Sequence, residues 1–130
     1  MIGLDTNVAL RMLLADDPGQ TAAVRKLSQT LSPERPGFIN LIVLAEFIWV
    51  LQTGYRFSKP ELIEAVEFLL SKPDLRVDRE SLVREAVTRF QEGQSDLADL
   101  LIGLVNQAAG CETTYTFDRR AGKLGEMSLA

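Results

Sequence analysis

Histidine is absent from the 130-residue chain, and cysteine occurs once, as Cys111. The lack of histidine excludes catalytic systems that pair it with serine or cysteine, and the paired-histidine route to RNA cleavage. One cysteine allows no internal disulfide and is too few for a zinc site made of Cys and His ligands. Acids, bases and metal ligands must therefore come mainly from carboxylates, whose oxygens suit hard cations.

Long hydrophobic segments are also missing. The most apolar run, residues 41–51, is too short to span a membrane and is interrupted by Glu46. The residues after Met1 form neither a basic leader nor a signal-type apolar stretch. We see no linker, repeat or low-complexity stretch. We therefore expect a single domain over residues 1–130 that works in the cytoplasm without a membrane.

The net charge of −4 does not exclude a nucleic-acid partner. Ten of the 14 basic residues are arginine, whose guanidinium group binds phosphate through two parallel hydrogen bonds. If four of the 18 acidic residues sit in a metal site, the remaining acids balance the basic residues.

Short apolar segments alternate with helical patterns along the whole chain. Strands are expected at residues 2–4, 37–39, 75–77 and 113–117, and helices at 7–14, 17–31, 40–51, from 58, from 78, and from a Ser95 cap to 109. The predicted caps of the first four helices are Thr6 or Asn7, Asp17, Asn40 and Ser58, with capping boxes closed by Gln20 and Glu61. Strands separated by helices of this size pair in parallel through right-handed crossovers. The pattern predicts an α/β fold, a three-layer α/β/α sandwich with a mostly parallel sheet.

Two aspartates directly follow predicted strands. Asp5 follows the first strand and Asp118 the last, and ligands of open α/β sheets bind beyond these carboxyl ends. Each aspartate also has a structural alternative. Asp5 can be a cap or turn residue, and Asp118 can start a turn before Arg119.

Two further acids stand among apolar residues. Glu46 has five apolar neighbours on either side, and a buried glutamate needs a charged partner or a metal. A salt bridge to an arginine, or a place at the helix edge, is the alternative. Asp99 leads another apolar run and lies one turn from Asp96, so the two can share a helix face. Asp96, next to Ser95, suits the helix dipole better, which makes Asp99 the better ligand candidate.

These acids lie in four segments that resemble the PIN-domain ribonucleases, in particular VapC-type toxins of toxin–antitoxin pairs. The segments are MIGLDTNVALRMLLADDP (1–18), LAEFIWVL (44–51), DLLIG (99–103) and TFDRR (116–120), and they occur in the family's order. The resemblance implies a five-stranded, mostly parallel sheet and an endoribonuclease that depends on Mg²⁺ or Mn²⁺. It also implies a small antitoxin as partner and a homodimer.

The resemblance assigns roles to individual side chains. The catalytic acids would be Asp5, Glu46, Asp99 and Asp118; Asp5, Asp99 and Asp118 would hold the metal, and Thr6, Asn7, Asp96 and Thr116 would support them. Arg11, Arg119, Arg120 and Lys123 are candidate phosphate contacts, with a solvated charged loop as their alternative. The expected substrate is RNA with single-stranded or structured loops, because sequence-specific readers mostly use unpaired bases.

Three other functions stay open. Asp5 could be the nucleophile of a phosphotransferase, but Asn7 stands where haloacid dehalogenase-like phosphatases have a second aspartate, and the paired acids of receiver domains are missing. A noncatalytic binding module and a PIN nuclease of RNA processing are the other two. For Trp49 we expect burial in the core rather than contact with a partner.

Overall fold

The computed structural model describes residues 1–130 as two compact units. Unit 1 comprises Met1–Glu80 and unit 2 comprises Ser81–Ala130. No helix in either unit combines the length and the hydropathy needed to cross a membrane.

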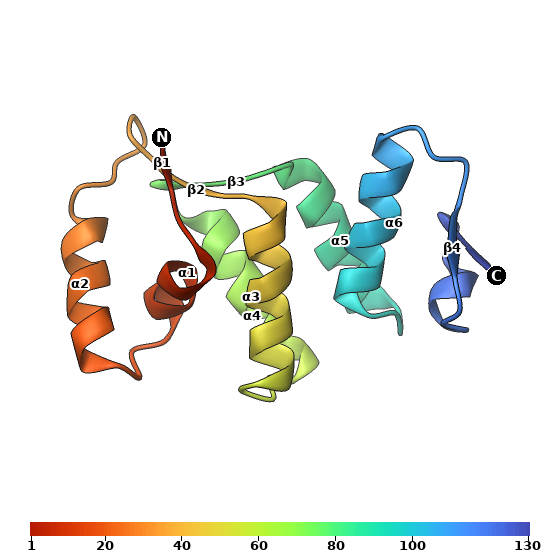
Figure 1. Cartoon of the computed structure of the whole chain (residues 1–130), viewed down its shortest axis with the longest axis horizontal. Coiled ribbons are helices and arrows are strands. Elements are labelled where there is room, and N and C mark those ends of the chain that lie inside the picture. Colours follow the sequence, from red (N-terminus) through yellow and green to blue (C-terminus); the bar gives the residue numbers. More distant parts are fainter. The chain divides into compact units, whose positions relative to one another are not determined.

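Unit 1 holds a three-stranded parallel sheet and four helices (Figure 1). In chain order the elements are β1 (Ile2–Gly3), α1 (Thr6–Leu13), α2 (Pro18–Ser28), β2 (Gly37–Ile39), α3 (Leu41–Thr53), α4 (Lys59–Ser71) and β3 (Leu75–Val77). The sheet has the order β1-β2-β3, with Ile2 opposite Gly37 and Gly37 opposite Leu75. All three strands are parallel, so their carboxyl ends lie at one edge of the sheet.

Side-chain caps fix where the helices of unit 1 begin. Asp5, Asp17, Asn40 and Ser58 each accept a hydrogen bond from a backbone N–H of the first turn. The predicted capping box is confirmed in α4, where Glu61 also accepts from the Ser58 backbone at 2.9 Å. This bond to the charged form lowers the pKa of Glu61.

The core of unit 1 forms around one face of α3. Leu44, Phe47 and Leu51 are fully buried there, at the spacing of a helical stripe. Helix α1 packs against α2 and α3, and α4 packs against α3 and β3. Gly37 lets β2 pass close to the core, because a Cβ on this residue would lie 2.6 Å from the Leu4 side chain.

Unit 2 holds two helices and a small parallel sheet. Its elements are α5 (Glu80–Glu92), α6 (Leu97–Ala108), β4 (Thr114–Thr116), the 3₁₀ turn η1 (Ala121–Lys123) and β5 (Met127–Leu129). Strand β4 pairs with β5, and α6 packs against β4. Arg89 of α5 forms a part-buried, two-pronged ion pair with Glu126, with one N–O distance of 3.0 Å. The pair lowers the pKa of Glu126 and raises that of Arg89.

The α/β class and the parallel strands agree with the prediction, but the arrangement of the strands does not. The five strands form sheets of three and two, not one five-stranded sheet. Each strand is only two or three residues long, so it forms few hydrogen bonds with its neighbours. Its sequence also holds too few residues to indicate which strand lies beside it. The pattern could therefore predict strands and their direction, but not which edges pair.

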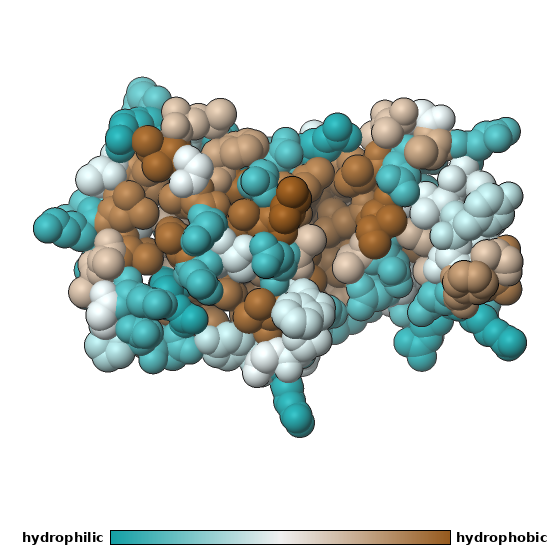
Figure 2. Space-filling view, viewed as in Figure 1, coloured by the Kyte–Doolittle hydropathy of each residue, from teal (hydrophilic) through white to brown (hydrophobic).

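Four local predictions are wrong. Asp5, not Thr6 or Asn7, caps α1, and Gln20 closes no capping box on α2. Asp96, not Ser95, caps α6, because its Oδ1 accepts from the Ala98 N–H at 2.8 Å. Trp49 is 64% exposed, and Ile42, two turns earlier on α3, is 73% exposed. Figure 2 shows apolar side chains at the surface over this helix. Helix α3 is apolar almost all round, so its sequence does not distinguish the face that packs from the face that does not.

Candidate active site

Asp5 lies where β1 ends and α1 begins. Its backbone is extended, and its Oδ1 accepts a hydrogen bond from the Val8 N–H at 3.1 Å. The structural alternative for this residue is thus realised, since Asp5 caps α1. The cap uses only one carboxylate oxygen, and Oδ2 accepts no hydrogen bond within the protein. Capping and metal binding are therefore compatible at Asp5.

The next residue, Thr6, connects this position to α3. Its hydroxyl donates a hydrogen bond to Oε1 of Glu46 at 3.1 Å, although the two residues are 40 positions apart. Unit 1 therefore brings Asp5 and Glu46 to the same place. Glu46 is exposed and pairs with no arginine, so of its two predicted structural alternatives the salt bridge does not occur and the place at the exposed edge of the helix does. Its Oε2 accepts no hydrogen bond within the protein.

Unit 2 brings three carboxylates near one another at the start of α6 and the end of β4. Partial burial, and then the negative charges of Asp96 and Asp118, raise the pKa of Asp99. Asp118 caps the following turn, since its Oδ1 accepts from the Ala121 N–H at 2.9 Å. Thr116 supports it from β4, where the threonine hydroxyl accepts from the Asp118 N–H at 3.0 Å.

The four predicted acids share one property across the two units. Each has at least one carboxylate oxygen that accepts no hydrogen bond within the protein. Asp5 and Asp118 each accept a capping hydrogen bond with one oxygen only. Glu46 accepts one hydrogen bond, from Thr6, and the Asp99 carboxylate accepts none. In neither unit do three such side chains converge into a metal-binding cluster. The two acids in unit 1 and the three in unit 2 nevertheless offer only carboxylate oxygens as metal ligands, the kind that Mg²⁺ and Mn²⁺ prefer.

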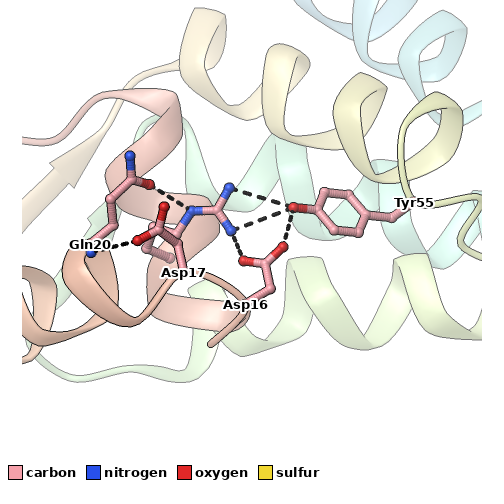
Figure 3. Close-up of polar contacts among 5 residues, drawn as sticks. Asp16, Asp17, Gln20 and Tyr55 are labelled. Atoms are coloured by element: carbon pink, nitrogen blue, oxygen red, sulfur yellow. Dashed lines mark hydrogen bonds and ion pairs between the residues drawn. The ribbon is translucent and has the colours of Figure 1, made fainter.

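The candidate phosphate contacts differ in how they are held. Arg11 is bound within unit 1, by an ion pair with Asp16 and a 3.0 Å bond from its Nε to Gln20. Tyr55 completes this network by donating to Asp16 at 2.7 Å (Figure 3). In unit 2, Arg119, Arg120 and Lys123 are exposed and form no ion pair. Arg119 and Arg120 follow Asp118 directly, and Lys123 lies in the next turn.

Three features of these surroundings were not predicted. The bond between Thr6 and Glu46 and the pair of Arg89 with Glu126 join residues distant in sequence, so no local pattern signals them. The family resemblance implied that Thr6 or Asn7 supports Asp5; in the structure the Thr6 hydroxyl donates to Glu46. Asp17 was predicted as a cap, but its neighbour Asp16 was not predicted to bind Arg11.

An α/β protein with acidic side chains at the carboxyl ends of its strands is the class that this fold and these residues define. The model of the PIN domain family matches residues 2–127, and the chain belongs to this family. The chain is also similar to a protein named VapC ribonuclease from Aquifex aeolicus (strain VF5). The two are 26% identical over 123 residues, which cover 94% of this chain and 90% of that protein.

Proposed function

We propose that the protein is a metal-dependent endoribonuclease whose catalytic acids are Asp5, Glu46, Asp99 and Asp118. At each of these four positions, at least one carboxylate oxygen accepts no hydrogen bond from the protein and is free to bind a metal ion. This observation, in a chain of the PIN domain family, carries the proposal. The similarity to a VapC ribonuclease supports RNA as the substrate.

Asp5, Asp99 and Asp118 would hold the ion, directly or through water. When bound, Mg²⁺ or Mn²⁺ supplies an acidified water and stabilises charge on the phosphate. Glu46 would orient the attacking water and accept its proton, with its carboxylate fixed by the Thr6 hydroxyl. Arg119, Arg120 and Lys123 would hold the RNA phosphates beside Asp118.

We further propose that the nuclease is the toxin of a toxin–antitoxin pair in the cytoplasm, inhibited by a small antitoxin and assembled as a homodimer. The similarity to a VapC ribonuclease over 94% of the chain supports this role. Induced expression should then arrest growth, and Asp5→Asn should abolish the arrest. Growth that continues with active wild-type enzyme would instead favour a nuclease of RNA processing.

The test of the nuclease is cleavage of total cellular RNA and of a labelled tRNA pool in Mg²⁺, Mn²⁺ or EDTA. Wild-type protein should give discrete products only with a metal, and Asp5→Asn and Glu46→Gln should give none. Asp17→Asn is the matched control for Asp5→Asn, because Asp17 caps α2 in the same way but follows no strand. Glu67→Gln, at an exposed site on α4, is the control for Glu46→Gln.

Loss of cleavage in both control variants would show that any change of charge disturbs the enzyme. The absence of cleavage by wild-type protein in either metal would favour a noncatalytic binding module.

A further inference from the structure

A pocket of about 240 Å³ lies in unit 1 between the end of α1, one face of α2 and the end of α4. Its lining includes three basic residues and two hydroxyl side chains; the basic residues are Arg11, Arg25 and Lys72, and the hydroxyls belong to Thr21 and Ser28. No acidic residue lines it, although the chain as a whole carries a net charge of −4. The remaining lining is aliphatic.

The charge in this pocket is only partly balanced within the protein. Arg11 is paired with Asp16, in the network drawn in Figure 3. Arg25 forms no ion pair, and the Lys72 ammonium has only the ring of Phe68, 5.0 Å from its centroid. Two side chains of the lining therefore carry a positive charge without a negative partner, an arrangement that favours an anion.

A buried hydroxyl adds a second, independent observation. Oγ1 of Thr21 is buried and has no hydrogen-bond partner in the protein. Leaving a buried hydroxyl unpaired costs free energy, which an acceptor within reach would recover. Thr21 lines the pocket, so a change of its χ1 angle on binding would let this hydroxyl donate to a bound acceptor. Ser28, which is only partly buried, adds a second hydroxyl to the lining.

We propose that this pocket binds a phosphate group. Arg25 and Lys72 supply the charge, and Thr21 and Ser28 donate hydrogen bonds to the phosphate oxygens. A phosphate of the RNA backbone is the source that fits a nuclease, and this part of the inference rests on the proposed function. Inorganic phosphate or a mononucleotide carries the same chemistry, and the two arms of the experiment distinguish these sources.

The first arm titrates inorganic phosphate into the wild-type protein and follows backbone amide signals by NMR. Signals of Thr21 and Ser28 should shift, and the double variant Arg25→Gln/Lys72→Gln should weaken binding about tenfold or more. The matched control is Lys26→Gln/Arg56→Gln, which removes the same two charges at exposed positions outside the pocket. Shifts that avoid the pocket, or equal weakening in both double variants, would overturn the proposal.

The second arm measures binding of a short single-stranded RNA in EDTA, so that cleavage plays no part. On single strands, each phosphate contact contributes roughly 0.7 to the steepness with which log K of binding falls with log salt concentration. Removing two contacts should therefore reduce this steepness by about 1.4. The control variant should keep the wild-type slope if Lys26 and Arg56 lie outside the RNA path. Phosphate binding without a change in the RNA slope would assign the pocket to a free phosphate compound and overturn the RNA assignment.

The two arms separate this inference from the proposed catalysis, since neither depends on turnover. If the double variant does not fold, Arg25→Gln alone and Thr21→Val carry the same test, because Arg25 is exposed and valine matches threonine in shape. Thr21→Val should weaken phosphate binding while circular dichroism stays unchanged. Preferential binding of an acidic peptide without phosphate would also contradict the proposal.

Discussion

The acidic side chains of the two units are stabilised in different ways. In unit 1, Asp5 and Glu46 accept hydrogen bonds from neutral donors, a backbone N–H and the Thr6 hydroxyl. In unit 2, Asp99 is partly buried beside two other carboxylates, and these surroundings raise its pKa. Unit 1 therefore holds its acids through hydrogen bonds, whereas Asp99 in unit 2 lies close to the negative charges of Asp96 and Asp118, which a bound cation would offset.

The largest expected effect is on catalysis by Asp5→Asn. Asparagine caps a helix as well as aspartate does, so the free energy of unfolding should stay within about 0.5 kcal/mol. Cleavage should fall by more than the roughly 10–100-fold typical of supporting residues around a metal. Asp5→Ala removes the cap too and should destabilise the protein by about 1 kcal/mol. Denaturant unfolding measures the capping role of Asp5, and RNA cleavage measures its catalytic role. An active Asp5→Asn variant beside an inactive Asp5→Ala variant would show that Asp5 is purely structural.

The next effect concerns the way unit 1 positions Glu46. Thr6→Val keeps the shape of the side chain but removes the donor to Glu46, and should lower cleavage about 10–100-fold. Thr6→Ser should restore most of the activity because it restores the hydroxyl. Thr88→Val, which removes a helical threonine hydroxyl in unit 2, is the control. Equal loss in the valine and serine variants would show that the bond to Glu46 does not matter.

Within unit 2, Glu126→Gln should have the largest effect on stability. The charged hydrogen bonds with Arg89 should be worth about 1–3 kcal/mol, measured by urea unfolding at neutral pH. Because the ion pair lowers the pKa of Glu126, its contribution is present above the ordinary glutamate pKa and is lost as pH falls through the lowered value. The cost of the substitution should therefore shrink in acid; a cost that is constant with pH would contradict the role of charge.

The smallest expected effect has the opposite sign. The raised pKa of Asp99 means that the native state binds the proton more tightly than the unfolded chain, so this group lowers stability as pH rises through that pKa. Asp99→Asn should therefore stabilise the metal-free protein at neutral pH, by about 0.5 kcal/mol, and not at low pH. Mg²⁺ should stabilise the wild type more than the variant. Thermal unfolding with and without Mg²⁺ at two pH values tests this, and destabilisation at neutral pH would contradict it.

The sequence predicted the α/β class, the parallel strands and the caps at Asp17, Asn40 and Ser58, because these depend on local periodicity and on side chains near their own backbone. It could not predict the division into two sheets or the exposure of Trp49, which depend on packing between distant segments.

The candidate site shows the same limit. Asp5 and Asp118 were placed at strand ends by the pattern alone, and the structure has them there. The pattern expected Glu46 to be buried, but it is exposed and held by Thr6, a partner 40 residues away. The basic pocket of Arg25 and Lys72 likewise joins α2 to the end of α4, and no spacing in the sequence indicates it.

The proposal that Asp5, Asp99 and Asp118 hold a metal ion is tested most directly by paramagnetic broadening with Mn²⁺. Amide signals near Asp5 and those near Asp99 and Asp118 should broaden at substoichiometric Mn²⁺. Asp5→Asn should reduce the broadening near residue 5, whereas Asp17→Asn should leave it unchanged. Broadening that avoids these acids, or that Asp5→Asn does not change, would contradict the proposed metal ligands.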